Sequence, residues 1–430
     1  MERDASKKGL NIVILHAPWN DRGDEAAVRA MIDSLRAQLP VKKMRVMIMR
    51  KNVTQFPYDD IDIVYPPALV PKNKGHLPLI LIYLDALLML FTFGKLSLSK
   101  QGRGFIKLVD EADVVIHACG GPCIGNFYGG KLLSDFPHLH RFLISKVFKN
   151  KPLFFYAPSM GPFLGRFRNL IRRFILKRAD ALIVREEISA GYLKEQLGLD
   201  SYVTADSALQ SDVPEDYISR YTSISEILSI IESENVVGMT ITDLKWHPIY
   251  GKYNGLGEKI VDSFLGLTQY LINKGYAILL IPQMFGGEPL DAPLLEDICK
   301  LVRGKMGQRI FVFPSEVDAY AQQVIISKLF CVISMRYHGS IFSAKGKVPF
   351  IAISYEHKIK GFVEQIELTD LMIDVEEISA EKIIDKFTYL EENYERIREQ
   401  LKNKVPSLKE KARATTKIVL EKLQHQSEGK

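Results

Sequence analysis

The chain has 430 residues, 47% of them hydrophobic, with 57 Lys and Arg against 51 Asp and Glu and a net charge of +6. The length predicts two domains, and the composition excludes a disordered or fibrous chain. Four cysteines are too few for a disulfide framework, so we expect reduced thiols. The apolar run after the charged residues 1–8 is too short for a signal peptide, which favours a cytoplasmic protein.

Short apolar runs alternate with longer amphipathic stretches along most of the chain, as in parallel sheets joined by helices. The first such unit has a strand at 11–17, a polar loop at 20–24, and apolar residues at helical spacing from Val28 to Leu39. Further strands are predicted at 45–49, 113–118, 153–156, 181–184 and 202–204.

The pattern restarts after a polar connection at 211–235. Strands are then predicted at 236–241, 276–281, 310–313, 331–334 and 350–354. We therefore expect an α/β fold with two Rossmann-like domains, 1–215 and 216–380, which face a cleft and bind ligands at the carboxyl ends of their strands. Residues 381–430 are predicted to form a C-terminal helical extension with a solvated, charged surface.

Two segments raise the question of membrane contact. Residues 77–93 are almost wholly apolar, but Pro78 and the central Asp85 favour a buried or interface-facing helix over a membrane span, with a monotopic contact as the alternative. Residues 165–178 hold six cations and no acid, a number equal to the net charge. This amphipathic helix either packs on the first sheet as an ordinary surface helix or contacts anionic lipid headgroups or a lipid-phosphate acceptor.

The most informative segment for function is 331–354. A buried strand ends at Ser334, and Gly339 and Ser340 open the helix that follows. Arg336 and His338 are thus predicted to lie at the carboxyl end of a strand, beside a helix N-terminus, where a phosphate or carboxylate binds well.

Other candidate residues follow predicted strands or glycine turns. Gly120 and Gly121 would let a ligand approach the backbone, and Arg185 either binds an anion or pairs with a neighbouring glutamate. Asp24 either caps a helix or takes part in catalysis. His357 and Lys358 belong to a second group able to bind anions after the 350–354 strand. There is no Walker loop, metal-binding motif or nucleophile elbow, and no pattern typical of nucleic-acid binding.

In their order along the chain, these motifs resemble those of the polysaccharide pyruvyl transferase family. The likeness spans about 11–374, and its most specific part is the run Ser-Met-Arg-Tyr-His-Gly at 334–339. It implies a fold similar to the GT-B glycosyltransferases and a transfer of pyruvate from phosphoenolpyruvate to a sugar as a ketal. It also implies a saccharide acceptor, which is either free or linked to a lipid. Phosphoenolpyruvate is the co-substrate in this prediction, and no cofactor or metal is expected.

The resemblance further implies roles for individual residues. His338 would be the general acid, Arg336 and Arg185 would hold the anionic groups, and Asp24 is the candidate base. Asn126 stands where the family commonly carries an acid and joins the candidate substrate-binding residues. Two alternatives stay open, a GT-B glycosyltransferase that uses a nucleotide sugar and a non-catalytic glycan-binding homologue.

Overall fold

A computed structural model describes residues 9–48, 56–66, 76–121, 124–126, 135–285, 290–306 and 309–428. The chain divides into two compact units, each with contributions from separate segments. Unit 1 consists of residues 1–19, 27–210 and 411–430, and unit 2 of residues 20–26 and 211–410. The domain boundaries predicted at 215 and 380 stay predictions.

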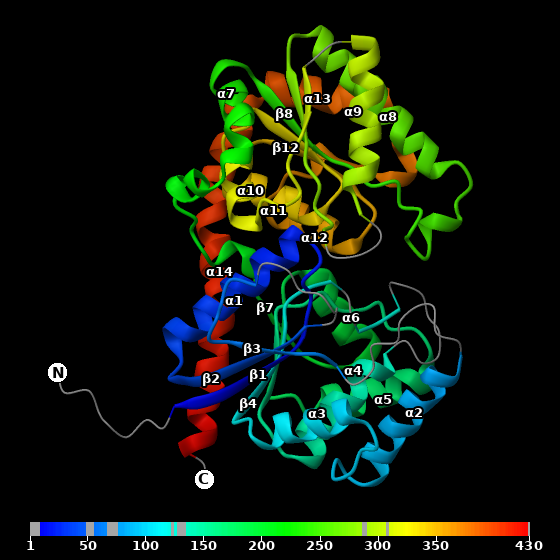
Figure 1. Ribbon diagram of the computed structural model, residues 1–430, viewed down its shortest axis with the longest axis vertical. Coiled ribbons are helices and arrows are strands. Elements are labelled where there is room, and N and C mark those ends of the chain that lie inside the picture. Colours follow the sequence, from blue (N-terminus) through cyan, green and yellow to red (C-terminus); the bar gives the residue numbers. More distant parts are fainter. Residues whose placement is uncertain are drawn as a thin grey trace, which may run out of the picture. The chain divides into compact units, whose positions relative to one another are not determined.

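Unit 1 contains a parallel sheet whose strand order is β3-β2-β1-β4-β5-β6-β7 (Figure 1). Its strands are β1 (Leu10–Ala17), β2 (Val41–Ile48), β3 (Asp62–Val64), β4 (Val114–His117), β5 (Leu153–Tyr156), β6 (Ala181–Val184) and β7 (Tyr202–Val203). Nearly every residue of the central strands is buried, as expected for parallel strands covered on both faces. The sequence analysis missed only β3, a three-residue strand at the edge.

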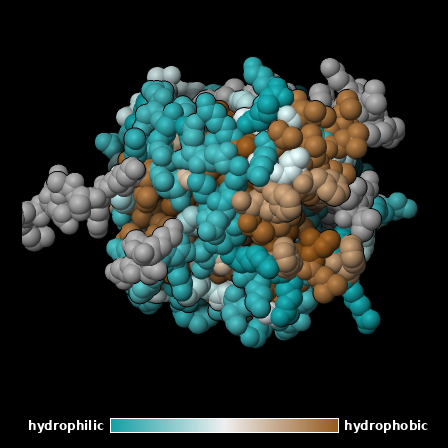
Figure 2. Space-filling view, turned by 90° about the horizontal axis from the view of Figure 1, so that it is seen from below, coloured by the Kyte–Doolittle hydropathy of each residue, from teal (hydrophilic) through white to brown (hydrophobic). Residues whose placement is uncertain are grey.

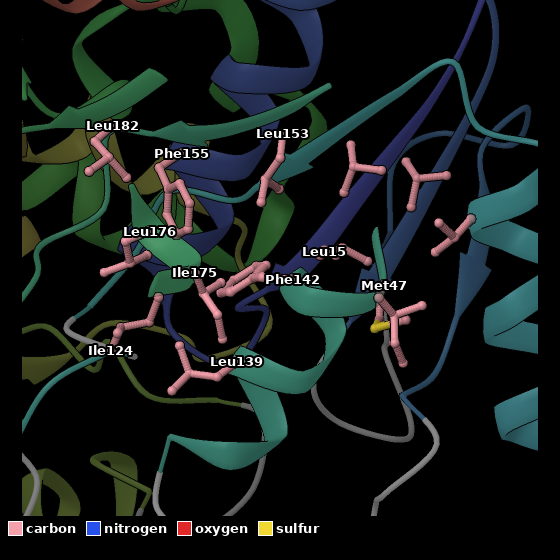
Figure 3. Close-up of a cluster of buried hydrophobic side chains, with 14 of the residues drawn as sticks. Leu15, Met47, Ile124, Leu139, Phe142, Leu153, Phe155, Ile175, Leu176 and Leu182 are labelled. Atoms are coloured by element: carbon pink, nitrogen blue, oxygen red, sulfur yellow. The ribbon is translucent and has the colours of Figure 1, made fainter. Parts of the chain in front are cut away.

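Helices cover this sheet and complete its core. They are α1 (Arg22–Gln38), α2 (His76–Phe91), α3 (Lys100–Asp110), α4 (Phe136–Phe142), the π-helix η1 (Leu143–Phe148), α5 (Arg166–Leu176) and α6 (Glu187–Leu197). In the core cluster of Figure 3, Leu15 and Phe155 from the strands lie among Leu139 and Phe142 of α4 and Ile175 of α5.

Unit 2 contains a second parallel sheet, with the order β10-β9-β8-β11-β12-β13. Its strands are β8 (Val236–Thr240), β9 (Ala277–Leu280), β10 (Ile310–Val312), β11 (Cys331–Ser334), β12 (Phe350–Ser354) and β13 (Met372–Asp374). Its helices are α7 (Ser225–Ser233), α8 (Leu256–Asn273), α9 (Ala292–Met306), α10 (Ala319–Ile326), α11 (Tyr337–Lys345), α12 (His357–Gln365) and α13 (Ala380–Glu392). Short 3₁₀ turns lie at η2 (Ser207–Leu209), η3 (Glu215–Arg220), η4 (Thr222–Ile224), η5 (Tyr250–Lys252), η6 (Thr369–Leu371) and η7 (Val375–Glu377).

The charge of residues 381–430 suggested a solvated extension, but one side of the C-terminal helix α14 (Tyr394–Glu428) is buried. Apolar residues along one side are buried, from Ile397 to Val419. In its second half, which belongs to unit 1, Thr415 donates a hydrogen bond to Thr204 Oγ1 at 2.9 Å, and Thr416 bonds to Tyr156. The buried stripe thus makes this half of α14 part of the packing of unit 1.

The apolar segment at 77–93 forms α2. In the described part of the chain no helix is long and apolar enough to cross a membrane. The buried carboxylate of Asp85 accepts hydrogen bonds from the hydroxyls of Ser97 and Ser99 and from Leu98 N. Cys119, Cys299 and Cys331 are buried, and Cys299 and Cys331 are free thiols, while Cys123 lies outside the described residues.

Candidate active site

The candidate site of unit 2 lies at the centre of its sheet. From β8 the chain builds the sheet in one direction through β9 and β10, and then in the other through β11, β12 and β13. Neighbouring β8 and β11 therefore form the switch point, and ligands of such sheets bind beyond the carboxyl ends of the strands at this point. The predicted segment 334–340 begins there, because Ser334 is the last residue of β11.

Hydrogen bonds fix the backbone where β11 passes into α11. Arg336 N donates to Thr240 Oγ1 at 3.1 Å, and Ser334 Oγ donates to Arg336 O at 2.7 Å. Gly339 lies against both strand ends, since a Cβ at this position would lie 2.3 Å from Ser334 Oγ. Glycine is thus required for the start of α11 to approach β8 and β11 this closely.

The guanidinium of Arg336 is buried and paired with Asp291. Nε donates to Asp291 Oδ2 at 3.2 Å, and Nη2 bonds to the second carboxylate oxygen. Burial by itself lowers the pKa of Arg336, but the charge of Asp291 outweighs burial and raises it, so the side chain is a permanent cation. The guanidinium also lies 5.4 Å from the ring centre of Trp246. Arg336 is therefore a rigidly held charge, and Nη1 has no bond to the described residues.

His338 lies in the first turn of α11 and contacts a carboxylate from far away in the sequence. Its Nδ1 is 3.5 Å from Asp21 Oδ1, and both side chains are largely buried. Burial raises the pKa of Asp21, but the hydrogen bond and charge of His338, together with Arg336, lower it overall. The carboxylate thus stays ionised near neutral pH and favours a proton on the imidazole.

Asp21 also fixes the start of α1, which packs against His338. Its Oδ1 accepts hydrogen bonds from Gly23 N at 2.7 Å and Asp24 N at 3.3 Å, so Asp21 rather than Asp24 caps this helix. A Cβ on Gly23 would lie 1.7 Å from the His338 ring. The start of α1 and the start of α11 therefore meet at the histidine, within unit 2.

Ser340, another predicted residue, lies in the first turn of α11. Its Oγ is buried and has no hydrogen-bond partner among the described residues. Buried hydroxyls are almost always satisfied, so this oxygen is available to a ligand at the helix N-terminus.

The start of α12 adds the predicted pair His357 and Lys358. Lys358 Nζ is ion-paired with the buried carboxylate of Glu356 and lies 5.7 Å from the ring centre of Tyr337. The Tyr337 ring in turn packs edge-on against His338, 4.9 Å away. His357 is the first residue of α12 and is partly buried. The two motifs after β11 and β12 thus lie side by side, as their positions in neighbouring strands predict.

Arg185 lies in unit 1, at the end of β6, and is fully buried. Its Nη1 donates to Asp206 Oδ2 at 2.6 Å and its Nε to Ser159 Oγ at 2.8 Å, while the carboxylate of Glu186 lies 3.6 Å away. The main ion-pair partner is thus Asp206 and not the adjacent glutamate. Burial raises the pKa of Glu186, against the lowering effect of Arg185.

The other predicted residues of unit 1 shape a loop. Gly120 adopts a φ of 146°, and Gly121 follows it in the loop after β4. The Asn126 side-chain oxygen accepts from Leu164 N at 2.8 Å and from Arg172 Nη1 at 2.9 Å. It therefore ties this loop to α5 instead of presenting an oxygen to a substrate.

Sequence reasoning missed a buried basic cluster at the switch point of the first sheet. His16 and His117 end the neighbouring strands β1 and β4, and their rings lie 5.3 Å apart; the His138 ring is 4.3 Å from His16. Arg141 is wholly buried, and its Nε and Nη1 have no hydrogen-bond partner in the described residues. Burial lowers the pKa of Arg141 to about 9 and that of His117 to about 4. The only sequence signal for this cluster was that His16 and His117 both lie at the carboxyl ends of predicted strands.

Two parallel sheets with their helices and a helical C-terminus define a two-domain, GT-B-like α/β protein, as predicted. Among solved structures, a putative UDP-N-acetylglucosamine 2-epimerase from Listeria monocytogenes matches with a TM-score of 0.62 and 13% identity, covering 98% of both chains. Anabaena Alr3699/HepE, solved with UDP and glucose, matches with a TM-score of 0.56 and 12% identity over 96% of this chain and 99% of its own. At such identities the likeness concerns the fold alone.

The model of the polysaccharide pyruvyl transferase family matches residues 22–357. The chain belongs to this family, as its motifs predicted, and is a transferase. The amylovoran biosynthesis protein AmsJ from Erwinia amylovora is 23% identical over 402 residues, which cover 89% of this chain and 92% of AmsJ.

Proposed function

We propose that this protein transfers pyruvate from phosphoenolpyruvate to a saccharide, forms a ketal and releases phosphate during polysaccharide biosynthesis in the cytoplasm. The acceptor in this proposal is a saccharide carried on a lipid phosphate. The family and the relationship to AmsJ support the reaction class. The observation that carries the proposal is the contact of His338 with Asp21 beside the buried cation of Arg336.

The reaction requires one proton donor and two proton acceptors. Protonation of the methylene carbon converts the enol of phosphoenolpyruvate into a methyl group and leaves an oxocarbenium ion at the neighbouring carbon. One sugar hydroxyl adds to this carbon, the bond to phosphate breaks, and a second hydroxyl adds. Of the two hydroxyl protons, one balances the proton given to carbon and the other leaves with phosphate.

His338 suits the donor role because Asp21 stabilises its protonated form. The carboxylate lies on the Nδ1 side, so the ring orientation is fixed and Nε2 faces away from Asp21. We assign His338 as the general acid and Asp21 as the residue that positions it. Asp24, in the first turn of α1, stays the proposed base for an acceptor hydroxyl.

The anionic groups of phosphoenolpyruvate would be held by the start of α11 and the neighbouring cations. The Ser340 hydroxyl and Nη1 of Arg336 supply donors that the described residues leave unused. Lys358 adds a charge at the start of α12. Arg185 keeps its proposed role as an anion-binding residue, although Asp206 and Ser159 already occupy Nη1 and Nε.

Calorimetric binding of phosphoenolpyruvate, compared with that of UDP-sugars, tests the donor. The proposal predicts saturable binding of phosphoenolpyruvate, release of inorganic phosphate with an acceptor, and a gain of one pyruvyl ketal in the acceptor's mass. Consumption of a nucleotide sugar without pyruvylation would instead make the protein a GT-B glycosyltransferase.

The variant His338→Gln tests the assigned acid. We expect transfer to fall at least a hundredfold, the usual contribution of a general acid, while the thermal midpoint changes by only a few degrees. The matched control is His425→Gln in α14, which should leave transfer unchanged. If His338→Gln unfolds the protein instead, the histidine is structural and the assignment fails.

A further inference from the structure

Exposed large hydrophobic side chains gather in one part of unit 1. Among the described residues, 12 of the 18 such side chains lie within 81–98 and 164–174, and Figure 2 shows a broad hydrophobic area on the side where Figure 1 draws α2 and α5. We call these 12 residues the α2–α5 face: Leu81, Leu84, Leu87, Phe91, Phe93, Leu96, Leu98, Leu164, Phe167, Leu170, Ile171 and Phe174.

An ordinary surface helix buries its apolar side and exposes its charged side, but α5 exposes most of its apolar residues. Its buried side carries Arg172, whose Nε and Nη2 pair with Asp135, whereas Phe167 and Leu170 are 71% and 66% exposed. If α5 packed on the first sheet as an ordinary surface helix, its apolar residues at helical spacing would be buried. Of these five residues only Ile175 is buried, and Phe167, Leu170, Ile171 and Phe174 are exposed. A hydrophobic side that faces outward while an arginine faces inward needs an apolar partner.

The charges around the α2–α5 face are all positive. Within residues 76–98 the sole acid is Asp85, which is buried, and residues 164–179 contain none. The exposed cations are Lys95, Arg166, Arg173, Lys177 and Arg178. Two copies of this face would repel each other, whereas an anionic bilayer offers both apolar depth and negative charge.

A cavity of about 320 Å³ opens behind the face, between α2, α4, η1 and α5. Its walls are mainly apolar, with Leu90, Leu139, Leu143 and Ile171 among them, and Arg168 lies at its lining. The polar groups Asp135 and His140 are bonded to Arg172 and to Phe136 O. The volume falls in the range of ligand sites, and an apolar cavity favours hydrocarbon over water.

We propose that the α2–α5 face docks on an anionic bilayer and that this cavity takes up one alkyl chain of a lipid whose phosphate contacts Arg168. The apolar residues enter the headgroup boundary, and the surrounding cations bind acidic headgroups. This proposal concerns a surface of unit 1 and does not depend on the donor that the transferase uses.

Flotation of the full-length protein with vesicles tests the docking surface. We expect binding to vesicles of phosphatidylcholine with phosphatidylglycerol, weakened by high salt, and little binding to phosphatidylcholine alone. The variant Arg166→Glu/Lys177→Glu should lower partitioning more than tenfold, since each cation near an acidic surface contributes strongly. The matched control Lys411→Glu/Lys417→Glu makes the same charge change on α14 and should bind as the wild type does.

The contribution of the apolar residues of the α2–α5 face is tested by Phe91→Ser/Leu170→Ser. The control is Ile249→Ser/Leu301→Ser, which changes two exposed residues of unit 2. Only the first pair should abolish flotation, and its circular dichroism and thermal midpoint should stay unchanged. Equal flotation of all variants would overturn the proposal. The proposal would also be overturned if the wild type formed a dimer and did not bind vesicles, and if Phe91→Ser/Leu170→Ser dissociated that dimer. The face would then be a protein interface.

The cavity is tested with monomeric lysophosphatidylglycerol, which has one alkyl chain and one phosphate. We expect calorimetric binding by the wild type and its loss in Leu143→Trp, which fills the cavity, while flotation persists. Binding that is the same in both proteins would exclude the cavity as the site of the chain.

Discussion

The position of His338 depends on the absence of a side chain at Gly23. Any side chain there would overlap the imidazole, so Gly23→Ala should push His338 away from Asp21. We expect the maximal transfer rate to fall at least tenfold with little change in the thermal midpoint.

The control for this variant is Gly104→Ala in α3, where a Cβ meets nothing within 4 Å. This substitution should leave transfer unchanged and stabilise the helix by up to about 1 kcal/mol. Equal activities of the two variants would show that the contact with Gly23 does not position the histidine.

The buried histidines of unit 1 should make the stability of the fold sensitive to acid. His117 has a pKa of about 4 when folded and an ordinary pKa of 6.5, so the unfolded chain binds more protons between these values. The free energy of unfolding should therefore fall by roughly 3 kcal/mol for this group as pH drops from 6.5 to 4. His16 and His138 act in the same direction, because burial lowers their pKa too.

Chemical denaturation of His117→Phe at several pH values checks this expectation. The variant should lose part of the pH dependence in this window, and the wild type should be most stable above pH 6.5. A slope that is identical in both proteins would show that His117 does not stay neutral in the fold.

At the level of elements, the sequence predicted most strands and the motif after β11, because buried parallel strands and helix starts leave local patterns. It missed β3 and β13, whose three residues each include an aspartate and form no continuous apolar run. It also missed the contact of Asp21 with His338 and that of Arg336 with Asp291. These pairs depend on which loops the sheet order brings together, and no local spacing encodes that order.

The helix α14 shows the same limit, since its many charged residues concealed the side that is buried, which includes Thr415 and Thr416. Thr415→Val/Thr416→Val should lower the free energy of unfolding by roughly 1–3 kcal/mol, because hydrogen bonds to buried Thr204 and Tyr156 are lost. The control Ser407→Ala lies on the same helix and is exposed, so its effect in urea denaturation should be near zero. A double variant as stable as the wild type would show that these two hydrogen bonds contribute nothing to stability.

At the scale of the whole molecule, each unit is built from segments far apart in the chain. Residues 411–430 belong to unit 1. A chain that ends at 410 should therefore leave unit 1 incomplete and raise its cleavage rate in limited proteolysis severalfold. A chain that ends at 426 keeps the buried stripe and the bond of Gln426 to Asp180, and should resist as the wild type does.

The division of the chain also sets the order in which the protein can fold during synthesis. Unit 1 contains β1, which is made before residues 211–410 of unit 2, yet it receives Thr415 and Thr416 only after all of unit 2 has been made. Unit 2, in contrast, has all its residues by position 410. The half made first is thus the half completed last, and until then Tyr156 and Thr204 lack their partners in α14.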